Sequence, residues 1–125
     1  MRPETLAEVA ALTRSGESFD FALRNFLDEF QAQPDPARLR DEPLRLADAV
    51  AEGERHDAFL AAAAEALASE RGFDTPAWAW DETRKLRRPW FALPWKGVRA
   101  ILLLESPAAF RSRNLFVSAN ALSRV

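Results

Sequence analysis

Residues 78–116 read WAWDETRKLRRPWFALPWKGVRAILLLESPAAFRSRNLF, and we expect the rest of the chain to be organised around this stretch. Its first half contains every tryptophan of the protein, interleaved with arginine and lysine. Its second half contains Gly97–Glu105, which is apolar on nearly all sides. So short an apolar run fits a buried helix or a buried strand, and the helical context favours a helix. We therefore predict that Gly97–Glu105 is the central, buried element.

Charge is distributed very unevenly along the chain. Residues 1–82 contain 18 Asp and Glu against 8 Lys and Arg, a balance of -10. Residues 83–125 contain 9 Lys and Arg against Glu105 alone, a balance of +8, and the net charge is -2. Three interpretations are open: the two parts neutralise each other inside the fold, the basic part meets an acidic partner, or molecules associate head to tail.

The composition indicates one globular domain spanning residues 1–125. With 48% hydrophobic and 29% charged residues, a chain of this length can bury a single core. Its longest apolar run, Ala100–Leu104, is far shorter than the ~20 residues that cross a bilayer, so no membrane association is expected. The first residues lack the apolar segment of a signal peptide, and the chain has no cysteine. We therefore predict a cytoplasmic protein that is stabilised by packing alone.

Apolar periodicity, caps and breakers predict that nearly all elements are helices. Ser18 has the type and position of an N-cap, and the apolar residues after it recur at intervals of three and four. Asn114 is suited to close the last helix, with Leu115–Val117 extended after it. Helices are predicted at about residues 3–14, 19–32, 43–52 (with Leu44 inward), 54–70, 77–86, 97–105 and 107–113, with a short turn at 37–40.

These elements predict an all-α fold, a single compact domain of five to seven short helices. The core is expected to combine Ala100–Leu104 with the aromatic stripe Phe19–Phe30 and the face Phe59–Leu67. The segments Pro89–Phe91 and Pro94–Trp95 are predicted to form an irregular aromatic loop.

No catalytic apparatus is predicted. His56 is the only histidine and is expected at a solvated, acidic helix end, where with Glu52 it lacks the partners that a zinc site needs. Neighbouring acidic residues such as Asp81 and Glu82 diverge around a helix instead of converging on a substrate. No serine lies in a nucleophile-elbow sequence, and no glycines cluster into a phosphate-binding loop. We therefore predict a non-enzymatic protein without a metal site or cofactor.

The interleaved tryptophans and arginines predict a binding surface, because these residue types are enriched at the centres of protein interfaces. The predicted partner-binding residues are Arg84, Arg87, Arg88, Trp90, Trp95, Arg111 and Arg113. The alternative is a transcriptional regulator that binds nucleic acid through the basic C-terminal third. The acidic balance of residues 1–82 and a pI of about 5.5 argue against direct binding to a polyanion. A second alternative is a structural module that associates with itself as a homo-oligomer.

Five stretches carry a resemblance to a known group of proteins. The most distinctive is ESPAAFRSRNLFVSANAL at Glu105–Leu122, and the others are Asp20–Phe30, Glu42–Leu44, Thr75–Trp78 and Pro89–Phe91. Over most of its length the chain resembles small bacterial, largely actinobacterial, regulatory proteins that are described as antitoxin-like or as carrying a helix-turn-helix. The resemblance implies the antitoxin or regulatory half of a toxin–antitoxin pair, which acts by occluding a toxin-like protein. Because no stretch reads as a complete helix-turn-helix with a basic recognition helix, it implies protein binding rather than DNA binding.

Overall fold

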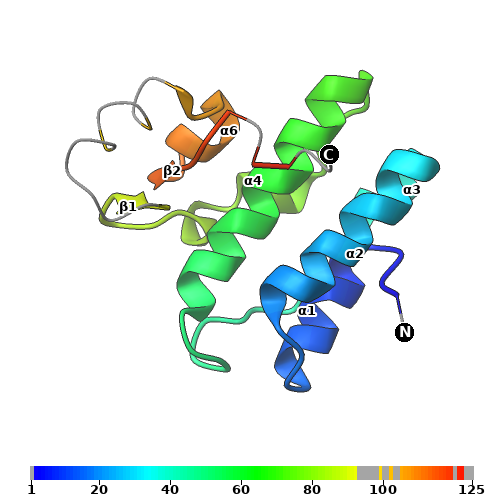
Figure 1. The fold of residues 1–125 in the computed structure, drawn as a ribbon, viewed down its shortest axis with the longest axis horizontal. Coiled ribbons are helices and arrows are strands. Elements are labelled where there is room, and N and C mark those ends of the chain that lie inside the picture. The colour runs from blue at the N-terminus through cyan, green and yellow to red at the C-terminus, as the bar shows by residue number, and fades with distance from the viewer. Residues whose placement is uncertain (1, 93–98, 100–101, 103–104, 120, 123–125) are drawn as a thin grey trace.

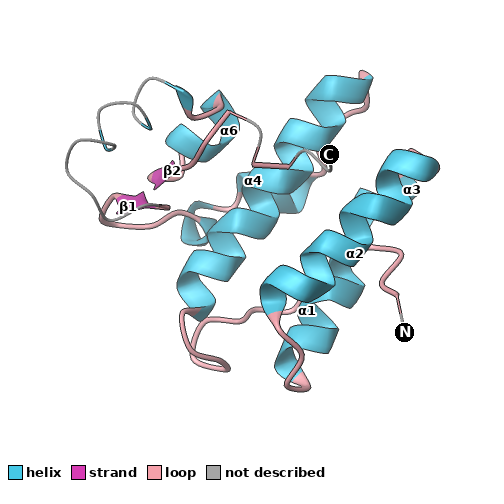
Figure 2. Ribbon diagram, viewed as in Figure 1, coloured by secondary structure: helices cyan, strands magenta, loops and turns pink. Residues whose placement is uncertain are grey.

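The computed structural model describes residues 2–92, 99, 102, 105–119 and 121–122, and it shows an all-α protein built around one long helix. This helix, α4 (Gly53–Arg71), lies between the pair α1 (Leu6–Arg14) and α2 (Phe19–Ala32) on one side and the C-terminal elements on the other (Figure 1). None of the described helices is long and apolar enough to cross a membrane. The remaining elements, coloured by type in Figure 2, are α3 (Ala37–Arg40), the 3₁₀ turns η1 (Ala77–Trp80) and η2 (Glu82–Arg84), β1 (Trp90–Phe91), α6 (Ala108–Arg111) and β2 (Leu115–Phe116).

Side-chain caps define where the first two helices begin. Thr5 Oγ1 accepts a hydrogen bond from Glu8 N (3.0 Å), so α1 begins after this cap and not at Pro3 as predicted. Ser18 Oγ accepts a hydrogen bond from Phe21 N (3.3 Å), which confirms the predicted cap of α2. The predicted bounds of α2 are also confirmed.

The predicted helix over residues 43–52 is wrong, because this segment is a loop with turns. Two backbone N–H groups of the loop donate to the carboxylate of Asp57 on α4 (2.8 and 3.0 Å), so they are satisfied without a helix. Asp48 and Glu52 have positive φ angles of 65° and 58°, which a right-handed helix excludes. Gly53, the residue after this segment, is the first residue of α4 and does not end a helix.

Two apolar clusters share α4 as their common wall. The first cluster joins α4 to α1 and α2 through side chains that include Leu6, Phe26 and Leu67. The second joins α4 to the C-terminal elements through Ala58, Ala62, Ala109, Phe110, Leu115 and Val117. Alanines on α4 let the neighbouring elements approach closely on both sides. Within the described structure, α4 is therefore the central element.

Only part of the predicted core lies within the residues that the structure describes. The segment predicted to be central, Gly97–Glu105, lies largely outside the described residues, and of the described ones Leu102 is buried. The aromatic stripe of Phe19–Phe30 is buried as predicted, at every position where the helical period places an apolar residue inward. The face predicted at Phe59–Leu67 is also in the core, although α4 buries a second side as well.

The helix predicted over residues 77–86 is replaced by two 3₁₀ turns, at 77–80 and 82–84, that are separated at Asp81. The Asp81 carboxylate accepts hydrogen bonds from Thr83 N (2.9 Å) and Thr83 Oγ1 (2.8 Å), which caps the second turn and competes with a continuous helix. Trp78 is buried, whereas Trp80 is 54% exposed. Trp78 and Trp80 are two positions apart in the sequence and cannot both lie at the centre of one helix face.

The C-terminal part contains a short parallel sheet of two strands. Trp90 lies opposite Leu115, and Phe91 lies opposite Phe116. The aromatic loop predicted at this point therefore contains a strand, because β2 supplies partners for its backbone. Asn114 precedes β2 with a φ of 62°, the left-handed conformation predicted for the end of the last helix.

Candidate partner interface

Three hydrogen bonds bring two basic segments of the chain side by side. Leu86 N donates to Arg113 O (3.2 Å), and Asn114 Nδ2 donates to Leu86 O (2.7 Å). Trp90 N donates to Asn114 O (2.9 Å). Residues 85–90 consequently run along the turn between α6 and β2. We call residues 85–90 together with 111–114 the basic junction.

The basic junction exposes part of the predicted partner-binding set. Arg87, Arg88 and Arg111 are exposed, and within the described structure none of their side chains makes a hydrogen bond or an ion pair. Lys85 is exposed as well, and its Nζ lies 3.3 Å from Oε1 of Glu82. These three guanidinium groups, which have no ion-pair partner among the described residues, give this region an exposed positive charge.

Of the two tryptophans predicted to bind a partner, the structure describes only Trp90. Trp90 is half-buried, and the guanidinium carbon of Arg55 lies 4.6 Å from the centroid of its ring. The ring also packs against the second apolar cluster, so its position is fixed while part of it remains exposed. Trp95 lies outside the described residues.

Arg84 is completely buried, which corrects its assignment to a partner surface. Its Nη2 donates to Pro43 O (2.6 Å), and its Nη1 lies 3.7 Å from Oδ1 of the buried Asp57. The guanidinium carbon lies 5.0 Å from the centroid of the Trp78 ring. Burial, together with the nearby charge of Arg45, lowers the pKa of Arg84, and the Asp57 carboxylate opposes that shift. Arg84 therefore holds the loop before α4 in place.

Arg113 is 1% exposed, and the same correction applies to it. Its Nη1 donates to Glu65 Oε1 (2.6 Å) and to Ala109 O (2.7 Å), and its Nη2 donates to Ala79 O (2.8 Å). The guanidinium carbon lies 5.7 Å from the centroid of the Trp80 ring. Arg113 thus connects α4, α6 and η1, and its charge is paired inside the fold.

Two of the exposed apolar side chains lie beside the buried arginines, and the sequence did not predict their exposure. Trp80 is 54% exposed, and Leu44, predicted to face inward, is 58% exposed. Each directly follows a residue whose carbonyl oxygen accepts a hydrogen bond from a buried arginine, Arg113 or Arg84. The backbone beneath both side chains is therefore fixed. For Trp80, the sequence signal is its spacing of two residues from Trp78, because the two rings cannot both lie at the centre of one helix face.

His56 is half-buried, in contrast to the solvated position that was expected. Its ring stacks on Phe19, with 4.1 Å between the ring centroids and an angle of 16° between the planes. Burial is the main cause that lowers the pKa of His56; Arg55 lowers it further, and carboxylates such as Asp20 oppose the shift. Among the residues that the structure describes, no three His, Cys, Asp or Glu side chains are grouped so as to hold a metal ion.

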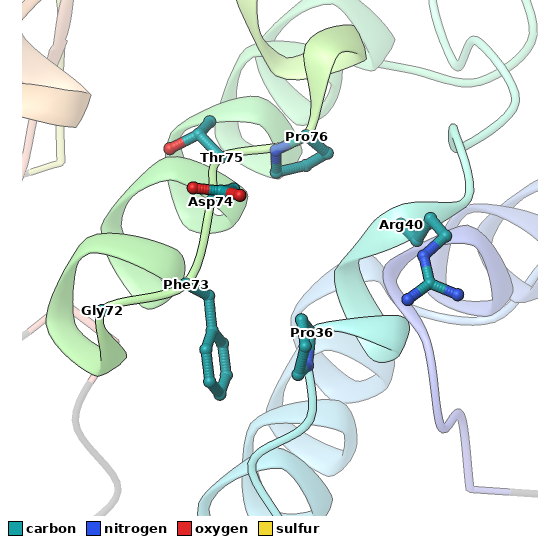
Figure 3. Close-up of a pocket in the computed structure, with 7 residues that line it drawn as sticks. All are labelled: Pro36, Arg40, Gly72, Phe73, Asp74, Thr75 and Pro76. Carbon is teal, nitrogen blue, oxygen red and sulfur yellow. The ribbon is translucent and has the colours of Figure 1, made fainter.

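A pocket of about 500 Å³ lies between α3 and the chain that follows α4 (Figure 3). None of the predicted site residues lines it. Its lining residues are Pro36, Arg40, Gly72, Phe73, Asp74, Thr75 and Pro76.

No family model matches the chain, and neither a curated protein nor a solved structure matches it. A function is therefore proposed from the geometry of the basic junction alone.

Proposed function

We propose that this protein is a non-enzymatic, cytoplasmic protein-binding module, similar to the antitoxin or regulatory half of a bacterial toxin–antitoxin pair, that acts by occluding a partner. The observation that carries the proposal is the basic junction. There, Arg87 and Arg88 lie in a segment that hydrogen bonds hold beside the turn bearing Arg111. All three side chains are exposed and lack a carboxylate partner in the described structure.

An acidic protein surface fits the charge and the exposed rings of this region best. Exposed cations steer an acidic partner toward the junction and accelerate encounter. Two aromatic rings, Trp80 and Trp90, can add apolar contact, and both are held by guanidinium groups. Because their backbone is already ordered, these rings lose little conformational freedom on binding.

Duplex DNA fits the charge distribution around this region less well. Arg84 and Arg113 face inward and cannot contact phosphates. The remaining cations belong to a chain whose first 82 residues carry a balance of -10 and repel a polyanion.

The proposal is tested by charge reversal at one residue of each basic segment. Proteins that copurify with the tagged chain from its native host are identified by mass spectrometry, and association rates of the purified pair are then measured. We expect Arg87→Glu combined with Arg111→Glu to slow association about tenfold or more at low salt. The matched control, Arg24→Glu combined with Arg71→Glu, changes the net charge equally on exposed positions of α2 and α4 and should leave the rate within about twofold.

A second comparison tests the aromatic contact. Trp80→Ala should accelerate dissociation of the complex, whereas Phe21→Ala, which removes a ring of equal exposure (54%) from α2, should not. Equal slowing of association by both charge-reversal pairs would contradict the proposed site. Salt-sensitive retardation of duplex DNA by the isolated protein, without any copurifying protein, would contradict the proposed function.

A further inference from the structure

The strand β1 lies at the outer end of the C-terminal elements. The helix α4 contacts α6, α6 contacts β2, and β2 pairs with β1 (Figure 1). Within the described structure the sheet contains only these two strands, so β1 has a neighbouring strand on one side only. The other side of such a strand presents N–H and C=O groups with which another chain can pair.

The backbone groups of β1 point alternately toward β2 and away from it. Trp90 N donates to Asn114 O (2.9 Å), and Ala92 N donates to Phe116 O (3.0 Å). Phe91 lies between these two donors, so its own N–H and C=O point to the opposite edge. Neither group makes a hydrogen bond within the described part of the chain. The outer edge of β1 therefore offers one donor and one acceptor to a further strand.

The other edge of the sheet is already occupied. Val117 N, directly after β2, donates to Ser106 Oγ (2.8 Å), and both residues are buried. At β1, in contrast, Phe91 is half-buried and Ala92 is exposed. A third strand can therefore be added beside β1, whereas the side chain of Ser106 fills the edge of β2.

Cations lie close to the open edge. Arg87 and Arg88 shortly precede β1, and both are exposed. Arg99 is exposed as well, and its guanidinium carbon lies 5.1 Å from the centroid of the Phe91 ring. None of these three arginines forms an ion pair among the residues that the structure describes. Their charge favours a strand that carries carboxylates.

We propose that the outer edge of β1 binds an extended, acidic segment of the partner protein as a third strand. The backbone of this segment pairs with the N–H and C=O of Phe91, and its carboxylates lie near Arg87, Arg88 and Arg99. This inference rests on the proposed function, because it specifies the part of the partner that meets the basic junction.

The experiment uses acetyl-Glu-Val-Glu-Val-Glu-Val-amide as the probe, because valine favours strands and glutamate supplies the carboxylates. The readout is the set of amide resonances of the ¹⁵N-labelled full chain. We expect saturable shifts at residues 90–92 and slower hydrogen exchange of the Phe91 amide, because its N–H becomes hydrogen-bonded. The same peptide with lysine in place of glutamate should not bind, since its charge has the sign of the arginines.

Two comparisons test the backbone pairing itself. Phe91→Pro and Phe91→Ala both remove the ring, but only proline also removes the N–H. We therefore expect Phe91→Pro to bind the acidic peptide about fivefold more weakly than Phe91→Ala. The peptide N-methylated at every residue keeps its charges but loses its donors, and it should bind the unaltered protein at least about fivefold more weakly. This second comparison decides the matter if the amide spectrum shows that Phe91→Pro does not fold.

A third comparison tests the charge. Arg88→Gln should weaken binding of the acidic peptide about two- to threefold, because an exposed ion pair is screened by water and salt. Arg24→Gln is the matched control, since Arg24 is an exposed arginine of α2 that forms no ion pair in the described structure. Equal affinities of these two variants would overturn the assignment of an acidic segment.

The inference would be overturned by an absence of saturable shifts at millimolar acidic peptide. Equal binding of the acidic peptide and its N-methylated form, or by folded Phe91→Pro and Phe91→Ala, would overturn it as well. These measurements do not involve the partner protein. Their failure is therefore distinct from failure of the proposed function, which the charge-reversal pairs test on the partner itself.

Discussion

Arg84 joins three parts of the molecule through one buried guanidinium group. It donates to Pro43 in the loop before α4, pairs with Asp57 on α4, and lies over the ring of Trp78 in η1. Among the described residues its Nε and Nη1 have no hydrogen-bond partner, so charge and ring contacts stabilise much of the cation. Removing one partner of such a pair leaves the other charge buried and uncompensated.

We therefore expect Arg84→Ala to lower the free energy of unfolding by about 3–5 kcal/mol, because Asp57 is 1% exposed and would lose its counter-ion. Arg87→Ala is the control from the same segment. Arg87 is exposed and unpaired, so its loss should change stability by about 0.5 kcal/mol or less. Urea denaturation followed by circular dichroism measures both variants. A similarly small loss in the two proteins would show that Arg84 is not needed to hold the loop.

Among the elements, α2 and α4 could be predicted from local signals. Ser18 and Gly72 mark the ends of helical periods and act as the caps that their residue types indicate. The loop at residues 43–52 and the break at Asp81 could not be predicted from the local pattern. In the loop, the group that replaces helical hydrogen bonds is the carboxylate of Asp57, which comes from another element.

The same limit applies to the candidate site, because the local sequence gives the residue types but not which side chains are buried by distant parts of the chain. Residue types pointed to Arg87, Arg88 and Arg111, which are exposed, but also to Arg84 and Arg113, which are buried. Nothing in the segment RKLRR distinguishes its first arginine from the others. The carbonyl that binds Arg84 is 41 residues away, and the carboxylate that binds Arg113 is 48 residues away.

The contact between the loop and the first turn of α4 leaves no room for a side chain at Gly53. A Cβ at this position would lie 1.8 Å from Leu46 O and 2.7 Å from Ala47 N. We expect Gly53→Ala to lower the free energy of unfolding by about 3 kcal/mol, because backbone atoms must move apart. Gly72→Ala is the control: its added methyl group meets nothing within 4 Å, and only its φ of 72° is unfavourable, at about 1 kcal/mol. Thermal unfolding measures the stability of both variants. A larger loss of stability in Gly72→Ala than in Gly53→Ala would refute a tight contact at Gly53.

Across the whole molecule, the opposite charges of the two parts of the chain are partly neutralised inside the fold. Arg84 and Arg113 from the basic part pair with Asp57, Glu42 and Glu65 of the acidic part. Internal pairing therefore accounts for these two cations. Binding of an acidic partner stays a prediction for the exposed cations of the basic junction.

The two apolar clusters are also connected through α4. Phe59, on this helix, packs against both clusters. Its ring centroid lies 6.1 Å from that of Phe19 in the first cluster and 4.9 Å from that of Phe110 in the second. Since one helix supplies a wall to each cluster, loss of either cluster exposes a face of the same element.

This connection predicts that the two clusters unfold together. Phe110→Ala removes a fully buried ring from the second cluster and should lower the free energy of unfolding by about 3–5 kcal/mol. If unfolding is one cooperative step, native-state hydrogen exchange should show the most protected amides of α2 losing as much protection as those of α6 and β2. Phe26→Ala, in the first cluster, should likewise lower the protection of the amides in α6 and β2 as much as that of the amides in α2. Phe21→Ala, which removes an exposed ring, should lower the protection of neither region. Loss of protection confined to α6 and β2 in Phe110→Ala would instead make the C-terminal part a separate unfolding unit, in which case α4 would not couple the two clusters.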